Sequence, residues 1–273
     1  MDLLSARSAR VKDARQLTVG KHRRVRGEFL AEGPQAVREA LAAGAVLELF
    51  VEQDSLERRA DDVVAAERAG IPAHLVEHGG FVGLVSAQSP QGVVARCRWE
   101  PAHLRGVLAQ PGPGQLALAH EMADPGNAGA LIRVADAAGA RGVALSDRSV
   151  DPTNPKCVRA TAGSLFHLPV VASGDTPTAL SAVRAAGYRV LAADVTADSV
   201  DLFAAEAAGL LDGRVAWVFG NEAHGLPDDV LAACDRVVRI PILGRAESLN
   251  LATAAAVCLY AVTRRSAGYA APT

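Results

Sequence analysis

The sequence has few aromatic residues: Phe, Trp and Tyr together make up 4% of its 273 residues. Alanine is abundant instead, so we expect a core of Ala, Val and Leu, as in helices packed on strands, rather than an aromatic-rich β-sandwich. Half of the residues are hydrophobic and 21% are charged, which excludes a globally disordered chain. The length suits one large domain or two compact ones, and we expect two.

Cysteines and long apolar runs are also scarce. The four cysteines lie far apart, form no CxxC pair and have no histidine at metal-ligand spacing: Cys97, Cys157, Cys234 and Cys258. This pattern predicts buried thiols and no metal site. No segment reaches the roughly 18 consecutive apolar residues of a membrane span, and the basic start of the chain has no apolar segment of the signal-peptide type. We therefore expect a cytoplasmic protein with no membrane partner.

Several common catalytic and nucleotide-binding motifs are missing. There is no GxxxxGK[ST], no GxGxxG after an expected strand and no GxSxG, and His120-Glu121 has no second histidine four residues further on. These absences weigh against a phosphate-binding P-loop, a dinucleotide-binding fold, an α/β-hydrolase and a zinc protease. Any chemistry has to come from residues outside these patterns.

The charge is close to balanced overall but unevenly distributed. The formal net charge is −2, which by itself argues against a polyanionic partner. Residues 1–28, however, hold eight Lys or Arg and three acids, a local balance of +5. Such a basic N-terminal segment is either a solvated amphipathic helix or an arm that contacts phosphate groups. In the second case the contacts are expected from Arg7, Arg10, Arg23, Arg24 and Arg26.

Helical periods alternate with short apolar runs along the chain. Residues 29–98, which begin with FLAEG, predict a small α/β domain, and residues 99–115, with three prolines and three glycines, predict a linker. Residues 116–273 alternate strand and helix, which predicts a parallel sheet covered by helices on both faces. We expect Asn127 to cap the first helix of this domain and Ser248 the last.

Ligands of parallel α/β sheets bind beyond the carboxyl ends of the strands, and three strand-to-loop junctions stand out there. The first is HEMADPGNAGALIR, the second VFGNEAHGLP and the third IPILGRAESLNLATA. In the second, the glycines after an apolar strand permit a tight turn with exposed backbone N–H groups. Each junction alone is compatible with an ordinary turn, and the three together predict a ligand site.

These three segments resemble the signature motifs of the SpoU/TrmH branch of the SPOUT RNA methyltransferases. The resemblance covers residues 115–265 and includes KCVRATAGSLFHLPV between the first two motifs. More weakly, residues 29–97 resemble the substrate-binding domain, similar to a kink-turn-binding ribosomal protein, that precedes the methylase domain in several members. The resemblance implies a SPOUT-type parallel sheet threaded into a trefoil knot, in a homodimer. It also implies transfer of a methyl group from S-adenosyl-L-methionine (AdoMet) to a ribose 2′-OH of RNA.

The resemblance also assigns roles to positions. It implies a cofactor pocket formed by Gly220, Asn221, Ile240, Ile242, Gly244, Ser248, Leu249 and Asn250. It implies a catalytic group of Asn127, Arg133, Glu222, Ser248 and Asn250. In this group Asn127 and Arg133 face the RNA, and Glu222 braces the site. Family proposals make the arginine at the position of Arg133 a base. Because arginine is normally protonated, we favour a role in orienting the RNA and stabilising negative charge.

The substrate is less specified than the reaction. The two-domain layout favours 23S ribosomal RNA, with transfer RNA as the second choice. A non-catalytic RNA-binding or ribosome-assembly protein of the same fold, and a small-molecule methyltransferase, remain open alternatives. His120 and His224 flank the site, and histidine is a common general base, but hydrogen bonding is favoured over catalysis for both. Tyr260 is expected in the core or a dimer interface, and Ser164 at a tightly packed position or in a pocket.

Overall fold

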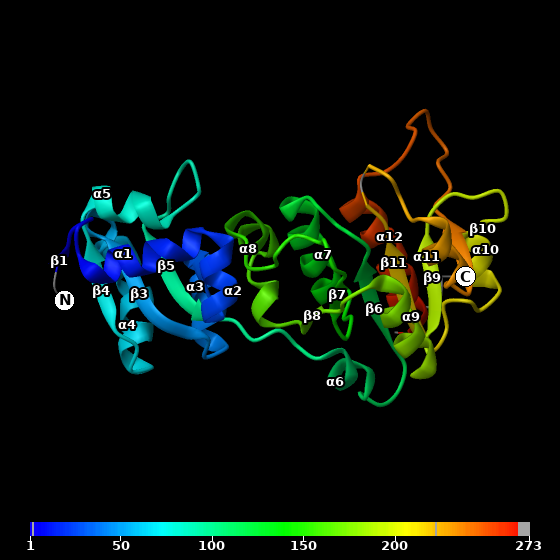
Figure 1. Ribbon diagram of the computed structural model, residues 1–273, viewed down its shortest axis with the longest axis horizontal. Helices are drawn as coiled ribbons and strands as arrows, with labels where there is room; N and C mark the ends of the chain where they lie inside the picture. Colours follow the sequence, from blue (N-terminus) through cyan, green and yellow to red (C-terminus); the bar gives the residue numbers. More distant parts are fainter. Residues whose placement is uncertain (2, 222, 267–273) are drawn as a thin grey trace, which may run out of the picture. The chain divides into compact units, whose positions relative to one another are not determined.

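The computed structural model describes residues 1, 3–221 and 223–266, and the chain folds into two compact units. Unit 1 comprises residues 1–100 and 151–167, and unit 2 comprises residues 101–150 and those from 168 onward. The sequence analysis predicted that residues 151–167 belong to the methyltransferase domain, whereas they pack with unit 1. The chain therefore passes between the units three times instead of once. Figure 1 labels most of the helices and strands of both units.

Unit 1 is built on a five-stranded mixed sheet of order β1-β4-β3-β5-β2. Its strands are β1 (Leu3–Leu4), β2 (Glu28–Glu32), β3 (Val46–Glu52), β4 (Ala73–Val76) and β5 (Val93–Arg98). Strand β5 runs antiparallel to β2 and β3, whereas β4 is parallel to β1 and β3. The helices are α1 (Ala9–Arg15), α2 (Gly20–Arg26), α3 (Pro34–Ala42), α4 (Ala60–Arg68), α5 (His78–Phe81) and α8 (Pro155–Thr161). The predicted small α/β domain is confirmed.

The basic segment 1–28 is part of this domain and not a separate arm. Val11 and Ala14 of α1, with Leu17 in the turn after it, are buried in a cluster that includes Leu30 and Phe50 of the sheet. The basic side chains of α1 lie on its exposed side: Arg10, Lys12 and Arg15. Of the two interpretations, the amphipathic helix describes α1, because its apolar face completes the core of unit 1.

Residues 151–167 join unit 1 through charged and aromatic contacts. Arg159 forms an ion pair with the buried carboxylate of Glu32 at 3.0 Å. His167 Nε2 lies 3.0 Å from Glu39 Oε2, and the ring of Phe166 stacks on Phe29 with 5.9 Å between centroids. The pattern of apolar residues gave no sign of these partners, because they are far apart in the sequence.

Unit 2 is built on a seven-stranded sheet of order β10-β12-β9-β11-β6-β7-β8, and all of its pairings are parallel. The strands are β6 (Gly114–Ala119), β7 (Val143–Leu145), β8 (Val170–Ala172), β9 (Arg189–Ala193), β10 (Val200–Asp201), β11 (Arg214–Phe219) and β12 (Arg236–Arg239). The helices are α6 (Leu104–Leu108), α7 (Pro125–Ala137), α9 (Thr176–Ala185), α10 (Leu202–Ala207), α11 (Asp228–Ala232) and α12 (Leu251–Ser266). The parallel sheet predicted for this half of the chain is confirmed.

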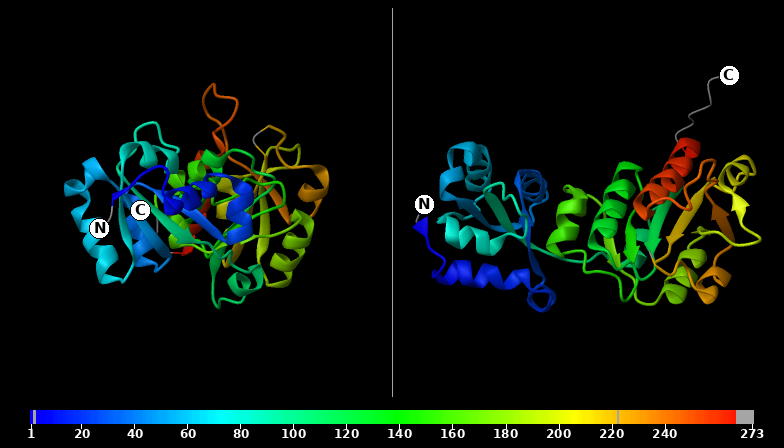
Figure 2. Two further views of the ribbon diagram at one scale, coloured as in Figure 1. Left: turned by 60° about the vertical axis from the view of Figure 1, so that its left-hand side comes forward. Right: turned by 90° about the horizontal axis from the view of Figure 1, so that it is seen from above.

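Helices cover both faces of this sheet (Figure 2). Alternate residues of β11 point to opposite faces. Ala216 and Val218 pack in a cluster with α6, α9 and α11, while the fully buried Trp217 lies on the face covered by α7 and α12. Helix α6 falls within the predicted linker 99–115, and it is structured because Val107 and Leu108 are buried in the same cluster.

Three of the four cysteines are buried, namely Cys97, Cys157 and Cys258. Burial raises the pKa of the Cys97 and Cys258 thiols. Cys234 is only half-buried, and burial together with the neighbouring Asp235 raises its pKa to about 12. The prediction of buried thiols thus holds for all but Cys234. Within the described residues, no helix has the length and apolar character needed to cross a membrane.

Candidate functional site

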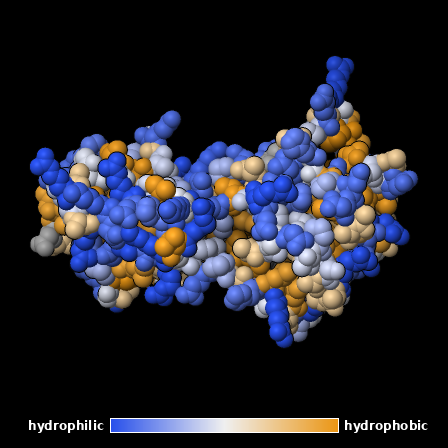
Figure 3. All heavy atoms as spheres, in the orientation of Figure 1, coloured by the Kyte–Doolittle hydropathy of each residue, from blue (hydrophilic) through white to orange (hydrophobic). Residues whose placement is uncertain are grey.

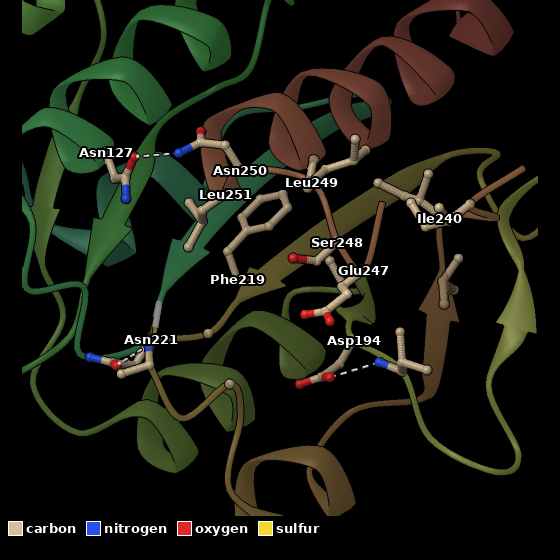
Figure 4. Close-up of a pocket in the computed structure, with 18 residues that line it drawn as sticks. Asn127, Asp194, Phe219, Asn221, Ile240, Glu247, Ser248, Leu249, Asn250 and Leu251 are labelled. Atoms are coloured by element: carbon tan, nitrogen blue, oxygen red, sulfur yellow. Dashed lines mark hydrogen bonds between the residues drawn. The ribbon is translucent and has the colours of Figure 1, made fainter. Parts of the chain in front are cut away.

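A cavity of about 510 Å³ lies at the carboxyl ends of three neighbouring strands of unit 2 (Figure 4). The residues at and after the ends of β9, β11 and β12 line it, together with the start of α12 and one residue of α7. Eight residues predicted from the three motifs lie around this cavity: Asn127, Gly220, Asn221, Ile240, Ile242, Ser248, Leu249 and Asn250. Segments more than a hundred residues apart in the sequence thus meet at one edge of the sheet, as expected for parallel strands.

The second motif forms a closed turn after β11. Asn221 and Gly225 exchange two backbone hydrogen bonds, of 3.0 and 2.9 Å. A Cβ atom on Gly220 would lie 2.5 Å from the carbonyl carbon of Gly225, and Gly225 has a φ of +66°, so both positions require glycine. The Asn221 side chain donates to the carbonyl of Glu121 at 2.7 Å and accepts from the N–H of Ala223 at 2.9 Å. The turn is therefore fixed to the end of β6.

The third motif is an exposed loop that leads into α12. Asn250 Oδ1 accepts the backbone N–H of Ala252 at 2.9 Å, which satisfies a free donor at the start of the helix. The predicted capping residue was Ser248, which instead lines the cavity two residues earlier. The Nδ2 group of Asn250 donates to Asn127 Oδ1 at 3.3 Å and so connects the third motif to the first.

The first motif lies at the start of α7. Asp124 is its capping residue and accepts the N–H of Asn127 at 2.9 Å. The cap was predicted at Asn127, but the helix begins earlier because Pro125 has the backbone angle of a first helical residue. The side chain of Asn127 is therefore not the cap of α7, and Asn127 lines the cavity. Arg133 lies six residues further on, on a different side of α7; it is exposed and does not line the cavity.

Several residues that line the cavity were not predicted. Phe219 ends β11, Asp194 follows β9 directly, and Glu247 precedes Ser248 in the third motif. Asp194 could have been predicted, because ligands bind beyond the carboxyl ends of parallel strands and Asp194 is the residue after β9. Of the predicted cofactor residues, Gly244 does not line the cavity. Glu222 lies outside the described residues.

The other candidates lie away from the cavity. His120 Nδ1 is 2.7 Å from the hydroxyl of Thr176, so it is hydrogen-bonded as expected, and His224 is exposed. Ser164 is buried in a 3₁₀ turn of unit 1. Tyr260 is half exposed on α12 and therefore not a core residue. Among the described residues, no group of His, Cys, Asp and Glu has the arrangement of a metal site.

The arginines predicted to contact phosphate groups differ in their surroundings. Arg23 is 5% exposed, forms an ion pair with Asp151 at 2.9 Å and donates to the carbonyls of Leu17 and Thr18. Its guanidinium is committed within unit 1, which contradicts the predicted phosphate contact. Arg10 is paired with Glu48, and Arg26 with Asp13. Arg7 and Arg24 are exposed, and no ion pair involving them occurs among residues 1, 3–221 and 223–266.

Comparison with known proteins finds a family match in each of the two units. Residues 115–260 match the SpoU rRNA methylase family, and residues 8–95 match the MRM3-like substrate binding domain. The second match includes α1 and α2, in agreement with their place in unit 1. A parallel α/β sheet with these motifs at its carboxyl edge, joined to a substrate-binding unit, defines an RNA methylase of two domains. The chain belongs to the SpoU rRNA methylase family.

The relatives are similar over nearly their whole length. The 23S rRNA (guanosine(2553)-2'-O)-methyltransferase RlmP of Bacillus subtilis is 32% identical over 259 residues, or 94% of this chain and 96% of that protein. The 23S rRNA (uridine(2479)-2'-O)-methyltransferase of Streptomyces viridochromogenes is 32% identical over 99% of this chain and 95% of that protein. An AdoMet-bound rRNA methyltransferase from Sinorhizobium meliloti has a TM-score of 0.80 at 35% identity, covering 97% of this chain and 98% of that one.

Proposed function

We propose that this protein transfers a methyl group from AdoMet to a ribose 2′-OH of 23S ribosomal RNA. The observation that carries the proposal is the convergence of residues from all three motifs on one cavity of unit 2. The names of the relatives support the substrate, since RlmP and the Streptomyces enzyme are both 23S rRNA 2'-O-methyltransferases. A ribosomal substrate would place the protein in the cytoplasm.

The cavity fits AdoMet in size and in the chemistry of its walls. Phe219, Ile240, Leu249 and Leu251 supply apolar walls for an adenine ring, and the closed turn at Gly220 presents backbone groups at its rim. The amides of Asn127 and Asn250 and the hydroxyl of Ser248 add polar groups, a mixture typical of cofactor sites. When bound there, AdoMet supplies a methyl group activated by its positive sulfonium.

The chain's own residues have to bring the 2′-oxygen into line and stabilise the charge that develops on it. Asn127 and Asn250 are held together at the cavity by their mutual hydrogen bond and can orient the ribose, which supplies much of the acceleration in such a displacement. The guanidinium of an arginine donates hydrogen bonds and accepts none, so the role proposed for Arg133 is to hold the RNA and stabilise the negative oxygen. The role of Glu222 in bracing the site stays part of this proposal.

Unit 1 is the proposed RNA-binding part of the enzyme. The exposed arginines Arg7 and Arg24 and the paired but accessible Arg10 and Arg26 are its expected phosphate contacts, together with Arg133 of unit 2. Arg23 is left out of this set because it is buried. Gly244 is kept in the cofactor proposal only as part of the loop 240–250, since it does not line the cavity.

A homodimer with a trefoil-knotted chain completes the proposal. Large apolar side chains are exposed on the third-motif loop and on α12: Leu243, Leu249, Val257 and Tyr260. Figure 3 shows apolar atoms at the base of the loop that projects from unit 2. Exposed apolar side chains grouped in this way are typical of protein interfaces, and a second protomer would cover them.

Labelled methyl transfer distinguishes the candidate functions. The purified protein is incubated with AdoMet labelled in its methyl group and with 23S rRNA, transfer RNA or no RNA. Label in 23S rRNA alone supports the proposal, and label in transfer RNA alone supports the second substrate. Label on a small molecule without RNA would indicate a small-molecule enzyme. Absence of transfer, with RNA binding retained, would indicate a non-catalytic RNA-binding protein.

A further inference from the structure

Two carboxylates line the cavity, and none of the described residues that line it has a basic side chain. Among the described residues that line the cavity, only Asp194 and Glu247 have acidic side chains. Neither forms an ion pair with any residue in the described ranges. Figure 4 shows both carboxylates directed into the same part of the cavity, beside Phe219 and Ser248. This part of the cavity is therefore suited to a positively charged group.

Asp194 is held in position by backbone groups. Its Oδ1 accepts the N–H of Val195 at 2.7 Å, and its Oδ2 accepts the N–H of Leu226 at 3.1 Å. These bonds join the end of β9 to the residue after the second-motif turn and fix the direction of the carboxylate. Two neutral N–H donors orient the charge without cancelling it, so its field still reaches the cavity.

The substrate and product forms of the cofactor differ in charge at one atom. AdoMet carries a positive sulfonium, whereas S-adenosylhomocysteine (AdoHcy), the product after methyl transfer, has a neutral thioether at that position and is otherwise the same molecule. A binding site that contains uncompensated carboxylates stabilises the positive form over the neutral one. Shape and hydrogen bonding distinguish the two far less, because only a methyl group separates them.

We propose that Asp194 and Glu247 make the cofactor site selective for charge, so that AdoMet binds more tightly than AdoHcy and the spent product is released. This inference rests on the proposed function, because it assumes that AdoMet occupies the cavity. Asp194 is half-buried and Glu247 is exposed, so solvent screens both. We therefore expect each carboxylate to contribute about two- to fivefold in affinity, the upper half of the range for exposed charge pairs.

Calorimetric titration of the full chain tests this inference with three ligands. AdoMet and sinefungin are positive at the critical position, since sinefungin has a protonated amine there, and AdoHcy is neutral. The variants Asp194→Asn and Glu247→Gln remove charge with little change in shape. Each is expected to weaken the binding of AdoMet and sinefungin by about two- to fivefold while leaving that of AdoHcy unchanged. Asp228→Asn, an exposed acid of α11 that does not line the cavity, should change none of them.

Other outcomes separate this inference from the proposed function. Equal losses for AdoMet and AdoHcy would overturn it and would assign the carboxylates to groups that both molecules share, such as the ribose hydroxyls or the ammonium of the amino-acid part. Equal affinity of the unaltered protein for AdoMet and AdoHcy would also overturn it, with the proposed function intact. If the unaltered protein binds none of the three ligands, the proposed function itself fails. Glu247→Gln lies in an exposed loop, so it keeps the test valid if Asp194→Asn disturbs the fold.

Discussion

The proposed reaction depends most on Arg133, although Arg133 does not line the cavity. It lies on α7, exposed, on a different side of the helix from Asn127. An arginine in this position can meet RNA without touching the cofactor. The proposed mechanism thus places the ribose-orienting Asn127 and the charge-stabilising Arg133 on different sides of one helix.

Replacing Arg133 with lysine tests this separation. Lys keeps the charge but loses the planar fork that holds two oxygens at once. We expect the single-turnover rate of RNA methylation to fall by about 100-fold, the size of effect seen when a charge-stabilising donor is removed. The affinity for AdoMet should stay unchanged. Arg105→Lys, an exposed arginine of α6, is the matched control, and a near-normal rate for Arg133→Lys would exclude both the base and the orienting role.

Asn250 has two functions that separate variants can distinguish. Asn250→Ser keeps an oxygen that can cap α12 but loses the donor to Asn127, so stability should be preserved while the methylation rate falls about tenfold, the value of roughly one hydrogen bond. Asn250→Ala loses both functions and should also lower the free energy of unfolding by about 1 kcal/mol. Denaturant unfolding and single-turnover rates measure the two effects. A normal rate for Asn250→Ser would show that the contact with Asn127 does not matter for the reaction.

The cysteines give a prediction that depends on pH. The pKa of Cys234 is raised to about 12, so the thiolate, which is the reactive form, is scarce at neutral pH. Alkylation of Cys234 by iodoacetamide should therefore be slow at pH 7 and rise about tenfold per pH unit up to pH 10. Mass spectrometry of the modified peptides gives the rate, with the denatured protein as the control. A rate that levels off between pH 8 and 9 would contradict the raised pKa.

Helix α2 carries two adjacent arginines with opposite surroundings. Arg23 is buried against Asp151, whereas Arg24 is exposed. Arg23→Gln should lower the free energy of unfolding by about 2–4 kcal/mol, because it leaves a partly buried carboxylate without its partner. Arg24→Gln should leave stability unchanged, weaken RNA binding and reduce the slope of log affinity against log salt by about 0.7–0.9. Thermal unfolding and filter binding at several salt concentrations measure these effects, and unchanged RNA binding for Arg24→Gln would remove α2 from the proposed RNA surface.

Sequence patterns predicted the strands around the cavity, but they misplaced two helix caps and missed the burial of Arg23. Strands β6, β9, β11 and β12 follow from short apolar runs, and parallel topology then brings the loops after them together. The cap of α7 was predicted three residues late, at Asn127 instead of Asp124, and that of α12 two residues early, at Ser248 instead of Asn250, because several residues near each helix start can act as acceptors. The burial of Arg23 could not be predicted, since its partner Asp151 is 128 residues away and no local pattern relates them.

Exposed arginines lie within the first 28 residues of unit 1, whereas two carboxylates line the cavity of unit 2. The net charge of −2 averages these regions and therefore says little about the partner. The exposed arginines of unit 1 favour a polyanion, while Asp194 and Glu247 favour a cation. This division matches an enzyme that takes a positively charged methyl donor and a negatively charged acceptor.

Mapping of ribose methylation in 23S rRNA tests the central proposal most directly. Unmodified 23S rRNA is incubated with the purified protein and AdoMet, digested, and analysed by mass spectrometry of the fragments. The proposed function predicts that one nucleotide gains a single methyl group on its ribose 2′-oxygen, and that the Arg133→Lys variant loses most of this signal. A methyl group on a base, or no gain in 23S rRNA while transfer RNA is methylated, would contradict the proposal.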